Sequence, residues 1–141
     1  MKAAVYIHLA WATWERAPLL IGELERGIHR SVITTCEELK AKVIAIGSTD
    51  DHIHLLVQLP SPLSVADLAR RAKGASAHLV THTLAIGSSF KWQSGYGSVS
   101  ISPRHLAQIT HYIANQRQHH ANNTTLPLLE QTQQPTNPQQ S

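Results

Sequence analysis

The chain has 141 residues, enough for one domain with its own hydrophobic core, and 42% of them are hydrophobic while 15% are charged. Its one cysteine, Cys36, excludes a disulfide framework or a cysteine-based zinc site within a single chain. The sequence shows neither a secretion signal nor a run of about 18 apolar residues, so we expect a cytoplasmic protein without a membrane partner.

The net charge of +3 is modest, but the charges are unevenly distributed. Between Leu68 and Leu129 the sequence contains no Asp or Glu, whereas the same span carries six histidines and six Lys or Arg residues. Those six are Arg70, Arg71, Lys73, Lys91, Arg104 and Arg117. Such asymmetry points to a polyanionic partner, with nucleic acid the first candidate, although a weakly basic surface without a partner explains the charges equally well.

The first half of the chain predicts two strands and a helix. Residues 3–11 alternate apolar and polar positions as a strand does, and residues 12–18 form a loop. Residues 21–39 place apolar side chains at helical spacing, which predicts an amphipathic helix. Residues 42–47 are a second short strand.

A third strand carries two histidines. The stretch Asp50–Pro60, DDHIHLLVQLP, is a β-branched and aliphatic run bounded by turn residues. Side chains at i and i+2 point to the same side of a strand, so the imidazoles of His52 and His54 share a face. Two such imidazoles form half of a metal site, although two strand histidines can share a face by chance.

The second half predicts a helix, a strand, a helix and a tail. Ser64 and Asp67 resemble a capping box before a helix over 65–84, and a short strand is expected at 96–101. Ser102-Pro103 opens a last helix that runs to about His120. Residues 121–141 are polar and rich in Pro, Gln and Asn, and we expect a disordered tail. This order of elements predicts an α+β fold with an antiparallel sheet.

The last predicted helix combines a nucleophile with an oxygen ligand. Tyr112 and Gln116 are four residues apart, so they share one helix face. A tyrosine oxygen attacks phosphorus once deprotonated, and a glutamine carbonyl suits a hard divalent ion beside two imidazoles. Taken alone, the pair also fits a core tyrosine next to a surface glutamine.

Taken together, the motifs DHIHLLVQLP, FKWQSGYGSVSIS and HYIANQRQHH resemble the single-tyrosine HUH transposases, small enzymes of bacterial insertion sequences that move as single-stranded DNA. The family's two histidines around a hydrophobic residue match His52-Ile53-His54, and its Tyr-Ile-x-x-Gln motif matches Tyr112 to Gln116. AVYIHLAWATWERAPLL also resembles the family's first strand and loop, so the resemblance covers about residues 3 to 120.

The resemblance implies a ferredoxin-like, RNA-recognition-like HUH fold over residues 1–120, and a homodimer in which Tyr112 often serves the partner's histidines. It implies that His52, His54 and Gln116 hold Mg²⁺ or Mn²⁺. Tyr112 would attack a phosphate of single-stranded DNA, folded as hairpins at the ends of the element, to give a 5′-phosphotyrosine link. His119 or His120 could replace Gln116 as the ligand.

Several basic and aromatic side chains are candidates for DNA contacts. Arg70, Arg71, Lys73 and Lys91 could bind phosphates. Trp92 and Tyr96 could stack on unpaired bases, although packing of their loop onto the sheet explains them equally well.

Three alternative functions are a DNA-hairpin binder, an RNA-recognition module and a two-histidine phosphoesterase. A domesticated relative could bind DNA hairpins without cutting them. An RNA-recognition module would need sheet aromatics, which the strand HIHLLVQL lacks. A two-histidine phosphoesterase would need a second His-x-Thr/Ser motif, and His82-Thr83 does not supply one.

Overall fold

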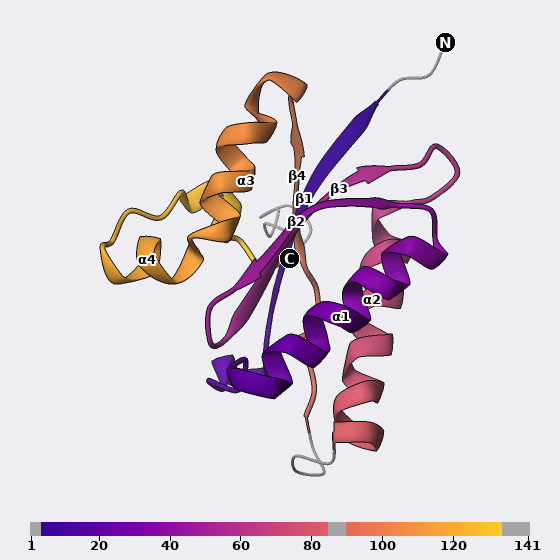
Figure 1. Cartoon of the computed structure of the whole chain (residues 1–141), viewed down its shortest axis with the longest axis vertical. Coiled ribbons are helices and arrows are strands. Elements are labelled where there is room, and N and C mark those ends of the chain that lie inside the picture. Colours follow the sequence, from indigo (N-terminus) through magenta and orange to yellow (C-terminus); the bar gives the residue numbers. More distant parts are fainter. Residues whose placement is uncertain (1–3, 85–89, 134–141) are drawn as a thin grey trace, which may run out of the picture.

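The computed structural model describes residues 4–84 and 90–133, and its centre is a four-stranded antiparallel sheet (Figure 1). The strands are β1 (Val5–Ala12), β2 (Lys42–Ser48), β3 (His52–Leu59) and β4 (Gly97–Ile101), in the spatial order β2-β3-β1-β4. With one helix after β1 and another after β3, this is the βαββαβ arrangement of ferredoxin-like folds. The predicted α+β fold is confirmed.

Two helices, α1 (Gly22–Glu38) and α2 (Val65–Leu79), lie together on one face of the sheet (Figure 1). The strands alternate, so Leu9, Trp11, Ile53 and Leu55 point to this face and are fully buried in the larger hydrophobic cluster. The side chain of Ser64 caps α2 by accepting a hydrogen bond from the Asp67 N–H at 3.0 Å, as the sequence predicted.

The other face of the sheet carries the C-terminal elements, α3 (Leu106–Ala114), α4 (Gln116–Ala121) and the short 3-10 helix η4 (Pro127–Glu130). Leu56 of β3 points to this side and packs with Ile109, Ile113 and Leu129 in a smaller cluster. Shorter helical turns are η1 (Trp14–Arg16), η2 (Val80–Leu84, π-type) and η3 (Pro103–His105). Because Leu56 points to this side and side chains alternate along a strand, the even-numbered side chains of β3 face the C-terminal elements.

Glycine is required where α3 crosses β2. A Cβ added at Gly47 would collide with the main-chain oxygen of Ile113, so a side chain at position 47 would displace α3. By contrast, a Cβ at Gly74 in α2 would meet nothing within 4 Å. The close approach of α3 to the sheet therefore depends on the missing side chain of Gly47.

The last predicted helix is interrupted. We expected one helix from Pro103 to His120, but α3 ends at Ala114 and α4 begins at Gln116. Between them Asn115 leaves helical geometry, with φ −115° and ψ 32°. The predicted strand start at Ala3 lies outside the described residues.

The described part of the predicted tail differs from the expectation. Residues 121–133 run back to the sheet, and Leu129 is only 4% exposed. A Cβ at Gly97 of β4 would collide with the main-chain oxygen of Gln131, so this segment also lies directly against the sheet. The apolar run Leu126-Pro127-Leu128-Leu129 supplies the side chain that packs there. Residues 134–141 lie outside the described part of the chain.

Across residues 4–84 and 90–133, no helix has both the length and the apolar composition that a membrane crossing requires.

Candidate active site

The two histidines of β3 lie side by side on the face covered by the C-terminal elements. His52 is 3% exposed, His54 is fully buried, and their ring centroids are 5.0 Å apart. The residues that pair with them in the neighbouring strands are small, because His54 lies opposite Ala10 on one side and Gly47 on the other. This leaves space above the sheet for both imidazoles, and the predicted shared face is confirmed.

The ring of His52 is fixed through its Nδ1 atom. That nitrogen lies 2.7 Å from Oδ1 of Asp51 and 2.8 Å from Oγ1 of Thr49, so its Nε2 atom is directed toward the C-terminal segment. Burial acts to lower the pKa of His52, but hydrogen bonds to Glu130 and Asp51 outweigh burial and raise it. A carboxylate behind a metal-binding imidazole is a common arrangement, because it fixes the ring and makes the free nitrogen more basic.

The ring of His54 is fixed by a third histidine. Nε2 of His8 in β1 lies 2.8 Å from Nδ1 of His54, and His8 is only 1% exposed. Burial, reinforced by the neighbouring His54, lowers the pKa of His8 to about 3, so His8 is neutral. If Nδ1 of His54 donates its proton to His8, then Nε2 of His54 is left with a free lone pair facing the site.

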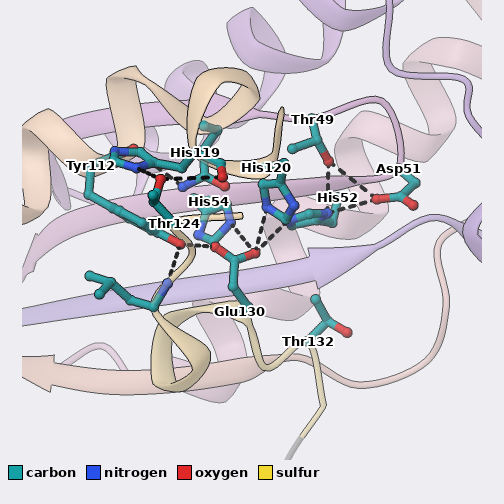
Figure 2. A network of polar contacts seen from close by, with 12 residues as sticks. Thr49, Asp51, His52, His54, Tyr112, His119, His120, Thr124, Glu130 and Thr132 are labelled. Atoms are coloured by element: carbon teal, nitrogen blue, oxygen red, sulfur yellow. Dashed lines mark hydrogen bonds and ion pairs between the residues drawn. The ribbon is translucent and has the colours of Figure 1, made fainter. Parts of the chain in front are cut away.

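Glu130 at the end of η4 is where these groups converge (Figure 2). Its Oε1 atom lies 2.8 Å from Nε2 of His52, 3.3 Å from Nε2 of His54 and 3.0 Å from Nε2 of His120. Burial alone would raise the pKa of Glu130, but the hydrogen bond with His52 and the close approach of the His54 ring outweigh burial and hold the pKa far below its usual range. The carboxylate is therefore ionised.

Tyr112 in α3 reaches the same carboxylate. Its hydroxyl donates to Oε2 of Glu130 and accepts a hydrogen bond from the Leu126 N–H at 2.9 Å, while the ring of His119 lies against it at a centroid distance of 4.7 Å. Burial, reinforced by the hydrogen bond to Glu130, raises the pKa of Tyr112 to about 12. The phenol is protonated at neutral pH in this arrangement.

Gln116 at the start of α4 is buried next to Tyr112. It is 2% exposed, and its Nε2 atom donates to the Tyr112 main-chain oxygen at 3.3 Å. Its Oε1 atom is buried without a hydrogen-bond partner, and so is Nε2 of His54, which approaches Glu130 without hydrogen-bond geometry. Unpaired buried lone pairs are costly unless something else binds them.

The donor set fits a divalent cation. One ligand atom from each of His52, His54, His120 and Glu130 can be chosen so that all four lie within 4.8 Å of one another. Nε2 of His54, in this group, and Oε1 of Gln116, outside it, have no hydrogen-bond partner. Imidazole nitrogens with carboxylate and amide oxygens are ligands for divalent ions such as Mn²⁺ and Mg²⁺.

Two residues of the cluster, Glu130 and His8, were missed by sequence reasoning. Glu130 lies in a segment that we expected to be a polar tail. It is the first acidic residue after a long span without Asp or Glu, and it follows an apolar run, which together could have indicated an ordered and functional segment. His8 shares a strand face with Tyr6, and the pairing of β1 with β3 that brings it to His54 involves residues 46 positions apart.

The residues predicted to contact DNA differ in their burial and in their contacts within the protein. Trp92 is 8% exposed, donates from its indole to Oγ of Ser76 at 3.0 Å and packs edge-on against Trp11, so it is a core residue and the prediction of a stacking surface is wrong. Nζ of Lys73 donates to the main-chain oxygens of Gln93 and Gly95 at 2.8 and 2.7 Å, which holds a loop in place.

Arg70, Arg71 and Lys91 are exposed. Arg70 and Arg71 lie on α2, in the layer on the other side of the sheet from Tyr112, and Arg70 pairs with Asp67 at 3.3 Å. Lys91 lies beside the loop after β1, where its main-chain oxygen accepts a hydrogen bond from the Trp14 N–H at 3.1 Å. The contacts of all three with DNA stay predictions.

Comparisons with known proteins agree with this geometry. Residues 1–116 match the family model described as "Transposase IS200 like". The ISDra2 transposase TnpA of Deinococcus radiodurans is 26% identical over 114 residues, which cover 77% of this chain and 81% of that protein.

Two solved structures share the fold. One, from Deinococcus radiodurans R1 and described as a transposase, has a TM-score of 0.64 and 25% identity, with 82% of this chain and 93% of that chain covered. The other, a REP-associated tyrosine transposase bound to a REP hairpin, has a TM-score of 0.63 and 16% identity, with 85% and 70% covered. With its sheet order, its paired histidines and the match over residues 1–116, the chain belongs to the IS200-like, single-tyrosine transposase family.

Proposed function

We propose that this protein cleaves and rejoins single-stranded DNA through a 5′-phosphotyrosine intermediate on Tyr112, with the assistance of a divalent metal ion, and thereby moves a DNA element. The substrate would be a hairpin-forming single strand, and the enzyme would act in the cytoplasm as a homodimer. The observation that carries the proposal is that the Tyr112 hydroxyl and both Nε2 atoms of His52 and His54 converge on one carboxylate, Glu130.

His52 and His54 would hold Mg²⁺ or Mn²⁺ together with the oxygens of Gln116 and Glu130. The unpaired lone pairs of His54 Nε2 and Gln116 Oε1 support this assignment, since an ion would satisfy both. The side chains behind the ligands, Asp51 and His8, fix the two rings. When bound, the ion would polarise the scissile phosphate and compensate the charge that develops on it.

Tyr112 would be the nucleophile. Its Oη atom forms a bond to the phosphorus as the bond from phosphorus to the 3′ oxygen breaks, and the departing strand takes up a proton to become a free 3′-hydroxyl. The phenolic proton leaves through the hydrogen bond to Oε2 of Glu130 and ends on the departing 3′ oxygen, so that the carboxylate is ionised again after the step. Attack of a 3′-hydroxyl on the phosphotyrosine reverses these steps and joins strands without ATP.

The high pKa of Tyr112 supports the need for added positive charge. With a pKa raised to about 12, first by burial and then by Glu130, the phenol does not ionise at neutral pH. A cation held near Glu130 would favour the phenolate electrostatically and would thereby lower that pKa.

The alternative function is a domesticated DNA-hairpin binder that no longer cuts. The test is to incubate the protein with labelled single-stranded DNA from the flanks of its own gene and Mn²⁺, then to run a denaturing gel. We expect a covalent protein–DNA band that disappears with chelator and with His52→Ala. A protein that retards the same DNA on a native gel but never forms that band would be a binder.

A further inference from the structure

The loop after β1 holds an aromatic side chain out in solvent. Trp14 is 42% exposed, yet its backbone is fixed, because its N–H donates to the Lys91 oxygen at 3.1 Å and Oγ1 of Thr13 donates to the Ala17 oxygen at 2.8 Å. The next two residues, Glu15 and Arg16, have φ values of 54° and 55°, a region that side chains other than glycine rarely adopt. Backbone conformations of this kind cost energy, and they cluster in proteins at sites where a side chain must be held in position for a ligand.

A lysine flanks the indole of Trp14. Nζ of Lys91 lies 3.9 Å from the ring centroid, a cation–π contact that fixes both side chains on the surface. Within residues 4–84 and 90–133, Lys91 forms no ion pair with a carboxylate. The ammonium is therefore available to a phosphate while it stays against the ring.

The same loop borders the candidate active site. The Thr13 N–H donates to the Asp51 main-chain oxygen at 2.9 Å. Nη1 of Arg16 lies 3.3 Å from Oδ1 of Asp51 and 3.4 Å from Nδ1 of His52, and the Arg16 side chain is 49% exposed. Arg16 thus lies at the edge of the site beside His52, and Trp14 is two residues away from it in the same loop.

We propose that Trp14 is a stacking platform for one unpaired base of the DNA strand, with Lys91 and Arg16 as contacts to the adjoining phosphates. This inference rests on the proposed function, since it takes single-stranded DNA as the substrate class. An exposed indole beside two cations matches an unpaired nucleotide, because a base offers a flat π-face and its phosphate a negative charge. Duplex DNA hides its base faces and would gain nothing from the ring.

The test compares binding of a fluorescent oligothymidylate by the full-length wild-type protein and by variants, with fluorescence anisotropy as the readout. Trp14→Ala should weaken binding by about 5- to 150-fold, the range found for loss of one stacked base, and Trp14→Phe should retain most of the affinity. Leu19→Ala is the matched control, because Leu19 lies in the same loop and is also 42% exposed, but cannot stack. It should bind as the wild type does.

A second probe removes the bases rather than the ring. An oligomer of the same length and charge built from abasic units should bind the wild-type protein more weakly than oligothymidylate, and Trp14→Ala should lose most of that difference. This comparison uses the wild-type protein, so it stands even if Trp14→Ala folds poorly. Equal affinity of the wild type for both oligomers, or oligothymidylate binding by a folded Trp14→Ala as tight as that of Leu19→Ala, would overturn the platform.

A separate measurement, the formation of a covalent adduct, tests the proposed function. If the wild-type protein and Leu19→Ala form no covalent adduct with the DNA of the element in Mn²⁺, cleavage through Tyr112 is contradicted. The binding comparison still decides on the platform, because it does not depend on chemistry.

Discussion

At the residue scale, the carboxylate of Glu130 joins the nucleophile candidate to the metal-site candidate. It contacts three imidazoles through Oε1 and the Tyr112 hydroxyl through Oε2. An ionised carboxylate that lies among imidazole nitrogens is well suited to bind a cation together with them.

Glu130→Gln should therefore weaken Mn²⁺ binding by about 10- to 100-fold, because the substitution keeps the size of the side chain and removes an anionic ligand. Isothermal titration calorimetry measures this directly. The control is Glu37→Gln, which makes the same charge change at an exposed position on α1. Unchanged affinity in Glu130→Gln would mean that His52, His54 and Gln116 hold the ion without it.

His8 makes a second prediction, on stability in acid. Burial lowers its pKa from 6.5 in the unfolded chain to about 3 in the fold, so below pH 6.5 the unfolded state binds a proton that the folded state does not. The contribution of His8 to stability is therefore fully present above pH 6.5 and is lost as the pH is lowered toward 3. The loss from this one group is about 2 kcal/mol at pH 5.

Urea unfolding at pH 7.5 and pH 5, with chelator present, tests this. The His8→Leu variant cannot titrate at this position and should lose less stability between the two pH values than the wild type does. An identical loss in both proteins would show that His8 is not buried in its neutral form.

At the scale of elements, the contact between α3 and β2 sets the position of Tyr112. Gly47→Ala should push α3 away, because the new methyl group would collide with the main-chain oxygen of Ile113. We expect a loss of about 1–3 kcal/mol in the free energy of unfolding, together with a lower yield of covalent adduct.

Gly74→Ala is the matched substitution. It adds the same methyl group within a helix, where nothing lies within 4 Å, and should stabilise the protein by up to about 1 kcal/mol. Thermal unfolding and the adduct assay on both variants show whether a methyl group at position 47 displaces α3. A Gly47→Ala protein as stable and as active as Gly74→Ala would contradict the close approach.

The elements also show what the sequence could and could not predict. The strands and the first two helices follow from alternation, helical spacing and the Ser64 cap, all of which are local signals. The break at Asn115 was missed because no proline or glycine marks it, and asparagine leaves helical geometry at little cost.

The candidate site was predictable only where it is encoded locally. His52, His54, Tyr112 and Gln116 stand in short motifs, and the structure places His54 beside His52 and Tyr112, and Gln116 beside Tyr112. Glu130 contacts His52 across 78 positions of sequence, and the burial of Trp92 depends on its packing against Trp11. Long-range packing of this kind leaves little trace in a single sequence.

At the scale of the whole molecule, one chain contains every part of the candidate site. The Tyr112 ring lies 6.2 Å from the His54 ring of the same chain, between centroids, and both side chains contact the same Glu130. The two faces of the sheet are thus divided between packing, on the side of α1 and α2, and chemistry, on the side of α3 and η4.

This arrangement predicts the outcome of mixing two inactive variants. If Tyr112 serves the histidines of its own chain, a mixture of Tyr112→Phe with His52→Ala should form no adduct, because every site lacks one part. Co-expression followed by the adduct assay is the measurement. Recovered activity in the mixture would show that the tyrosine acts on the histidines of another subunit.

The most direct test of the central claim is the Tyr112→Phe variant in the adduct assay. The substitution keeps the ring, its packing on α3 and its contact with His119, and removes only the oxygen. We expect the variant to bind hairpin single-stranded DNA as tightly as the wild type and to form no covalent adduct in Mn²⁺, while Tyr6→Phe and Tyr96→Phe form it normally. An undiminished adduct with Tyr112→Phe would contradict the assignment of Tyr112 as the nucleophile.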